Sequence, residues 1–133
     1  MLASFEARKL SSQPMGHNKI AVSEPNDEIH ALALQFFEGL KLSGPVSLEL
    51  KQDPQGRHWV IEPTIGRTDF WAGLCAANGV DLTLAEYRAQ CAEPLPAMSQ
   101  RRTHVWSIGE REPGESLWLL RIAPGQLLRH RLR

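Results

Sequence analysis

The chain has 133 residues, of which 42% are hydrophobic and 23% are charged, and its formal net charge is zero. These values are typical of a single globular domain with a core of its own. No apolar run approaches the roughly 20 residues of a membrane span, and the N-terminal residues lack the apolar core of a signal peptide. We therefore expect a cytoplasmic protein with no membrane partner.

The charge is unevenly distributed along the chain. Residues 1–98 hold 8 Lys and Arg against 12 Asp and Glu, a net charge of −4, whereas residues 99–133 hold 7 Arg against 3 Glu, a net charge of +4. We therefore divide the chain into a domain, 1–98, and a basic C-terminal extension, 99–133. Such a tail could bind nucleic acid. Because the seven Arg are scattered, we favour a surface segment that complements the acidic body.

Cysteine and histidine give no sign of a metal or catalytic centre. Cys75 and Cys91 are 16 residues apart and lack the spacing of zinc ligands. We interpret both as small buried hydrophobic residues on helices. The five histidines are widely separated, and none is assigned a role. The chain has neither G-x-x-x-x-G-K-[ST] nor G-x-G-x-x-G, and no Ser-His-Asp order stands out.

The N-terminal part predicts two short strands, at 2–10 and 20–22, followed by the clearest helix, at 26–40. Asn26 is a good N-cap for this helix. Its apolar residues recur at the i, i+3, i+4, i+7 spacing, which predicts one face packed against a core. These residues are Ile29, Leu32, Ala33, Phe36, Phe37 and Leu40.

The middle of the chain predicts a β-hairpin with strands at 45–51 and 57–65. Both strands alternate between apolar and polar residues, and the segment between them has the composition of a type I turn. Each strand carries one carboxylate near its centre, Glu49 on the first and Glu62 on the second. A two-residue loop would make these residues diagonal neighbours on one face, and a four-residue loop would place them directly opposite. A bulge would separate them.

Two like charges at this distance repel unless one takes up a proton or a cation neutralises them. A divalent cation is one solution, and Lys51 on the same face is another. The hairpin therefore has two interpretations, a metal site or a solvated polar face with a Glu–Lys pair. Arg67 follows the second strand and precedes a predicted helix, which is a suitable place to hold an anion.

The remaining elements are two short helices and a strand pair. Their predicted ranges are 70–78, 83–92, 103–108 and 116–122. Thr68 or Asp69 can cap the first helix, and Thr83 begins a capping box at the second. Trp106 and Trp118 are the predicted packing anchors of the strands. Together the elements predict an α+β fold, with a mainly antiparallel sheet packed by one long and two short helices.

Two segments of the hairpin region together resemble ATP-grasp carboxylate–amine ligases. They are E-L-K-x-D-P-x-G, beginning at Glu49, and E-P-T-I-G-R-T-D-F, beginning at Glu62. The chain is most similar to the C-terminal part of an uncharacterised bacterial branch found in polysaccharide-biosynthesis contexts. The resemblance covers roughly residues 3–95. It implies the fold of the C-terminal ATP-grasp subdomain.

The resemblance also implies cofactors and a reaction. In the family, Mg2+ bridges the phosphates of ATP to paired acidic residues, and a substrate carboxylate becomes an acyl phosphate that an amine displaces. On this chain the implied metal ligands are Glu49, Glu62 and Thr64, the last in place of the usual Asn. Arg67 is the implied catalytic residue and, with Lys9 and Lys51, the implied phosphate contact.

The family reaction also needs a lobe with an adenine pocket, which nothing before Phe5 could supply. We therefore expect a C-terminal fragment that binds Mg-ATP and is not active alone, with the missing N-terminal lobe or another protein as partner. The first alternative is a non-catalytic module that forms a homodimer or docks onto a partner through exposed apolar surface. The second is nucleic-acid binding through the Arg-rich tail.

Overall fold

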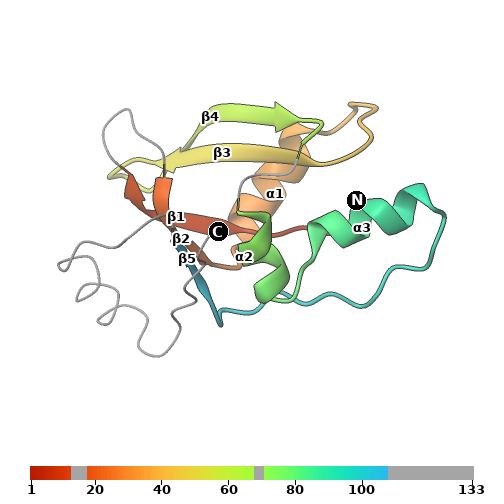
Figure 1. Cartoon of the computed structure of the whole chain (residues 1–133). Coiled ribbons are helices and arrows are strands. Elements are labelled where there is room, and N and C mark those ends of the chain that lie inside the picture. The colour runs from red at the N-terminus through yellow and green to blue at the C-terminus, as the bar shows by residue number, and fades with distance from the viewer. Residues whose placement is uncertain (13–17, 68–70, 108–133) are drawn as a thin grey trace.

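The computed structural model describes residues 1–12, 18–67 and 71–107. Within these ranges the fold is α+β, with two small antiparallel sheets and three helices (Figure 1). The predicted α+β class and antiparallel pairing are therefore confirmed, although the strands form two sheets instead of one. The finer assignment, to an ATP-grasp C-terminal subdomain, stays a prediction.

The first sheet has the strand order β1-β2-β5 and contains the core of the molecule. Its strands are Ala7–Ser12, Asn18–Ser23 and Val105–Ser107. Consecutive residues of β2 point to opposite faces, so Ile20 packs with Val105 while Ala21 packs with Leu74 and Trp106. Both faces of this sheet are therefore covered, and the predicted role of Trp106 as a packing anchor is confirmed.

Helix α1 spans Asp27–Phe36 and begins as predicted at Asn26. The Asn26 side chain accepts hydrogen bonds from the backbone N–H groups of Glu28 and Ile29, each at 3.1 Å. The predicted end at residue 40 is wrong, and so is the prediction that the apolar stripe forms core. No α1 residue is buried, and Phe36 is 41% exposed.

Two shorter helices follow the hairpin. Helix α2 spans Ala72–Ala77 and packs on the first sheet, and α3 spans Leu82–Gln90. Asp81, and not the predicted Thr83, caps α3, because its carboxylate accepts a hydrogen bond from Leu84 N at 2.9 Å. None of the helices in the described part of the chain is long and apolar enough to cross a bilayer.

The second sheet is the hairpin, formed by β3 (Val46–Gln52) and β4 (His58–Ile65). Figure 1 shows it as a separate layer beside β1 and α1. Neither strand contains a buried residue. The hairpin is thus attached to the body without sharing its core.

Several predictions concern residues near or beyond the described ranges. Strand 116–122 with Trp118, and the caps Thr68 and Asp69, lie outside the described residues. Residues 105–107 of the predicted basic extension form β5 and pair with β2. Cys75 is buried as predicted, whereas Cys91 at the end of α3 is exposed, so the prediction of a buried Cys91 is wrong.

Candidate functional site

The register of the hairpin brings its two central carboxylates together. Asp53 N donates to Arg57 O and Gly56 N donates to Asp53 O, each at 2.9 Å, so the loop has an odd number of residues. Gly56 has φ +83°, the left-handed conformation that such a turn requires. Neither of the two even loop lengths considered from the sequence is therefore present. If pairing continued regularly from this loop, Glu49 would lie opposite Ile61. The Glu62 side chain would then point to the other face of the hairpin.

A β-bulge at Ile61 reverses that outcome. Leu50 pairs with Val60, but the next pair is Glu49 with Glu62, which leaves Ile61 as the extra residue. We predicted that a bulge would separate the two glutamates, and the structure shows the opposite because the loop is odd. Directly opposed residues have Cβ atoms about 4.5–5.5 Å apart on the same face. Glu49 and Glu62 thus form a cross-strand carboxylate pair.

The register divides the hairpin side chains into two faces. The first, which we call the Glu49 face, carries Ser47, Glu49, Lys51, Trp59, Glu62 and Thr64. The second, the Leu48 face, carries Leu48, Leu50, His58 and Val60. The three predicted metal ligands therefore share the Glu49 face. Glu49 and Thr64 are half-buried, and Glu62 is exposed.

Among the described residues, two ion-pair contacts join the hairpin to the body. Lys9 Nζ of β1 lies 2.5 Å from Glu49 Oε2, and Nδ1 of His58 lies 3.0 Å from Glu28 Oε1 of α1. The Glu49 face is thus turned toward β1, and the Leu48 face toward α1. The ammonium group of Lys9 also lies 5.7 Å from the ring centroid of Trp71, within the range of a cation–π interaction.

Lys9, and not Lys51, is the cation that pairs with Glu49. Sequence reasoning named Lys9 only as a phosphate contact, because the pairing joins residues 40 positions apart and no local pattern reveals it. Lys51 is exposed and lies opposite Trp59. Arg67 is exposed and follows Gly66, whose φ is +83°. Of the predicted phosphate contacts, Lys9 is therefore the one that directly contacts the carboxylate pair.

The turn beside this face is held by Asp53. Its Oδ2 atom accepts hydrogen bonds from the indole Nε1 of Trp59 at 3.0 Å and from Nε of Arg57 at 2.8 Å, while Oδ1 accepts from the backbone of Gln55 and Arg57. The hydrogen bond from Trp59, with those from Arg57 and Gln55, lowers the pKa of Asp53 below its ordinary 3.8, although desolvation acts in the opposite direction. The Arg57 guanidinium also lies 5.6 Å from the Trp59 ring centroid. Trp59 is thus oriented although it is 55% exposed.

The chemistry of the Glu49 face suits a hard cation with a phosphate ligand. Mg2+ is commonly bound by one or two carboxylates, with waters and substrate phosphates completing the shell. Glu49 and Glu62 match that requirement, and the Thr64 hydroxyl is a further oxygen on the same face. Among the described residues, no group of three or more His, Cys, Asp or Glu could hold a metal ion. A cation on this face would therefore need waters or phosphate oxygens as further ligands.

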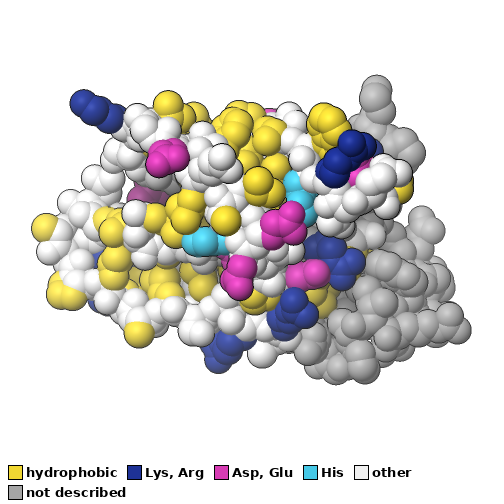
Figure 2. Space-filling view, turned by 180° about the vertical axis from the view of Figure 1, so that it is seen from behind, with side chains coloured by type: hydrophobic (Ala, Val, Ile, Leu, Met, Phe, Trp, Pro, Cys, Tyr) yellow, Lys and Arg dark blue, Asp and Glu magenta, His cyan; other side chains and the backbone are white. Residues whose placement is uncertain are grey.

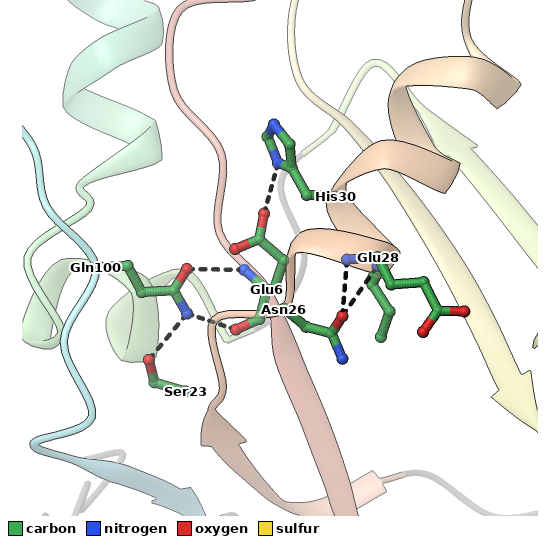
Figure 3. Close-up of polar contacts among 7 residues, drawn as sticks. Glu6, Ser23, Asn26, Glu28, His30 and Gln100 are labelled. Carbon is green, nitrogen blue, oxygen red and sulfur yellow. Dashed lines mark hydrogen bonds and ion pairs between the residues drawn. The ribbon is translucent and has the colours of Figure 1, made fainter. Parts of the chain in front are cut away.

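A second cluster, which sequence reasoning missed, lies on the body. His30 Nδ1 of α1 is 2.9 Å from Glu6 Oε1, and Figure 3 shows this pair beside Gln100. We assigned no role to any histidine, since Glu6 and His30 are 24 residues apart and belong to no common motif. A His at the fourth position of a helix gives no sequence signal for such a contact.

No protein-family model matches the chain, and neither curated proteins nor solved structures gave a match. The resemblance to ATP-grasp ligases stays a prediction based on the two hairpin motifs.

Proposed function

We propose that the Glu49 face binds Mg2+ and, through it, the phosphates of a nucleotide, with ATP as the expected ligand. The observation that carries this proposal is the direct pairing of Glu49 with Glu62 across the bulge. A bulge is a local departure from regular pairing that is often found beside functional sites, where it redirects a side chain. Here it sets two carboxylates on one face.

When no metal is bound, Lys9 neutralises the charge of Glu49 in the proposed site. In the ion pair it offsets the charge of Glu49, at 32% and 40% side-chain exposure for the two partners. Binding of Mg2+ would replace Lys9 as the neutralising charge, and the ammonium group would then be free to contact a phosphate oxygen. The same residue thus serves both states.

The reaction implied by the resemblance is ATP-dependent ligation of a carboxylate to an amine through an acyl phosphate. We propose binding as the activity of the residues described above, and ligation only in the presence of an adenine-binding lobe. Arg67, beyond the end of β4, is the proposed contact to the transferred phosphate. Mg2+ would supply charge neutralisation between the phosphates and the carboxylate pair.

The test is a titration of the intact protein with Mg-ATP, followed by tryptophan fluorescence, because Trp59 lies on the same face. We expect a saturable change at millimolar nucleotide that is lost in Glu49→Gln and in Glu62→Gln. Glu93→Gln is the matched control, since Glu93 is exposed beyond α3 and the substitution removes the same charge. Equal binding by all four proteins, or no change with millimolar Mg-ATP, would contradict the proposal.

A second candidate function, self-association, is favoured by the exposure of apolar side chains on β4. Val60 and Ile65, which share the Leu48 face, are 47% and 54% exposed. Two-stranded hairpins are marginally stable in water unless another element covers them. A second copy offers an identical hairpin, and two copies would bury these side chains about a twofold axis.

Analytical ultracentrifugation tests this candidate. We expect a concentration-dependent dimer that Val60→Asp dissociates and that Tyr87→Asp leaves intact, because Tyr87 is 61% exposed on α3. A monomer at every concentration would exclude it. The outcome is independent of the nucleotide titration, in which the substitutions are on the Glu49 face.

A further inference from the structure

A cavity of about 440 Å³ lies on the body. Its walls come from the N-terminal residues 1–6, from α1 and from the segment 95–100. Its lining is about half polar and half apolar; the apolar part includes Val80, Leu95 and Met98, and Val80 is only 3% exposed. Small-molecule sites usually have volumes of about 300–1,000 Å³, apolar walls and a few fixed polar groups. Figure 2 shows hydrophobic side chains around a hollow on the rear face of the molecule.

The polar residues that line this cavity are Ser4, Glu6, His30 and Gln100. Glu6 Oε1 lies 2.9 Å from His30 Nδ1, and the side chains are 14% and 32% exposed. A carboxylate accepts hydrogen bonds, so the shared proton belongs on Nδ1 of the imidazole. In Figure 3 the second ring nitrogen of His30 points away from Glu6. In the neutral ring this nitrogen, Nε2, is an acceptor.

The position of Glu6 is fixed by Gln100. The Gln100 amide accepts a hydrogen bond from Glu6 N at 3.1 Å and donates one to Glu6 O at 2.6 Å. Its Nε2 also lies 3.0 Å from Oγ of Ser23, which is fully buried. Glu24 N donates to the same Glu6 carbonyl at 3.0 Å. The carboxylate that orients His30 therefore stands on a backbone with little freedom.

We propose that this cavity binds a small apolar molecule with one hydroxyl group, such as an alkylphenol. The hydroxyl donates its proton to Nε2 of His30, and the hydrocarbon part contacts Val80, Leu95 and Met98. Glu6 is a positioning residue, because its carboxylate selects the tautomer with Nε2 as acceptor. None of these cavity residues lies on the Glu49 face, so binding in the cavity is independent of nucleotide binding.

Three probes of similar size test the proposal by NMR on the full chain: 4-ethylphenol, 4-ethylanisole and 4-ethylbenzoate. We expect 4-ethylphenol to shift the Val80 amide and the His30 Nε2 resonances with saturation. The anisole has no hydroxyl proton and should bind roughly 5- to 10-fold more weakly, the usual effect of one hydrogen bond. Equal affinity for phenol and anisole, tighter binding of the benzoate, or no saturable shift would overturn the proposal.

Two variants complete the experiment. His30→Phe should abolish the preference for the phenol over the anisole. His58→Phe is the matched control, because His58 also contacts a glutamate through Nδ1 but lies on the hairpin. It should keep the preference. If His30→Phe fails to fold, the Nε2 shift of the wild-type protein still decides, since only a direct hydrogen bond makes it differ between phenol and anisole.

Discussion

The two sheets of this protein differ in residue pattern and in burial, because β2 carries the unbroken apolar run 20–22 whereas the hairpin strands alternate. In the β1-β2-β5 sheet, neighbouring residues Ile20 and Ala21 are 1% and 0% exposed, so both faces are covered. In the hairpin, Ile61 and Ile65 are 55% and 54% exposed. The continuous apolar run thus belongs to a strand covered on both faces, whereas alternation in the hairpin does not ensure that its apolar residues are buried.

The polar contacts are also more buried in the body than in the hairpin. In the body, the buried side chain of Asn78 and the amide of Gln100 bind backbone groups of distant segments. The hairpin is joined to the body by side-chain pairs in which at least one partner is solvent-accessible. Elements with little buried surface open at lower free energy than the core. We expect the hairpin to be the less stable part, which is also where the proposed metal site lies.

The largest effect is expected from Asn78→Ala. Asn78 Oδ1 accepts from the backbone N–H groups of Thr103 and His104 at 2.8 and 3.0 Å, and Nδ2 donates to Leu74 O. Truncation leaves the Thr103 and His104 N–H groups without an acceptor, whereas Leu74 O keeps its hydrogen bond from the Asn78 backbone N–H. Each unsatisfied group costs about 1–3 kcal/mol, so a loss of about 4 kcal/mol is expected in urea unfolding. Gln52→Ala in the hairpin removes one exposed hydrogen bond and should cost less than about 0.5 kcal/mol. Similar losses in the two variants would contradict the expected difference in stability between the body and the hairpin.

Alanine substitutions at Gly79 in the body and at Gly56 in the hairpin test the same difference in stability. Gly79 has φ +94°, and a Cβ there would lie 2.4 Å from the carbonyl oxygen of Ser99. Gly56, in the hairpin turn, has φ +83° and open space around it. Gly79→Ala should therefore cost about 3 kcal/mol of unfolding free energy, and Gly56→Ala about 1 kcal/mol from backbone strain alone. Chemical denaturation of both variants separates the clash from the strain, and equal losses would rule out the clash.

A smaller effect is expected from the Lys9–Glu49 pair. Exposed ion pairs contribute about 0–1 kcal/mol, and both partners are partly exposed. A double-mutant cycle with Lys9→Met and Glu49→Gln should give a coupling below about 1 kcal/mol that decreases with added salt. A larger coupling would mean that the hairpin is held as firmly as the body, against the comparison.

The smallest effect is expected when the pH is lowered. The folded pKa of Asp53 is lowered, so its ionised form stabilises the turn. That contribution is fully present above the ordinary value of 3.8 and is lost as the pH falls toward the lower folded value. Trp59 fluorescence should report the change below pH 3.8, and Asp53→Asn should remove it. An unchanged titration in the variant would show that another group is responsible.

The sequence predicts much of this fold because its signals are local. Asn26 caps α1, α2 ends within a residue of its predicted position, and the hairpin strands begin and end within a residue or so of theirs. The end of α1 was wrong because an apolar stripe does not reveal whether a partner surface exists. Phe36 and Leu40 continue the stripe but remain exposed.

The candidate site was predicted in composition but not in geometry. Glu49 and Glu62 were identified from alternation, yet their pairing depends on an odd loop and a bulge, and neither has a distinct pattern of residue types. Lys9 reaches Glu49 across 40 positions, and His30 reaches Glu6 across 24. Contacts of this length depend on how sheets and helices pack, which single residues do not encode.

The bulge at Ile61 changes the curvature of β4 without changing which residues pair across the strands. It leaves each cross-strand partner where a ladder without Ile61 would put it, since Leu50–Val60 and Glu49–Glu62 flank the extra residue. What it adds is curvature, because a bulge bends its strand and increases the local twist. Deletion of Ile61 would therefore straighten β4 while keeping the two carboxylates opposite. If cation affinity survives the deletion, pairing is sufficient for the site, and if it is lost, the bend is part of the coordination geometry.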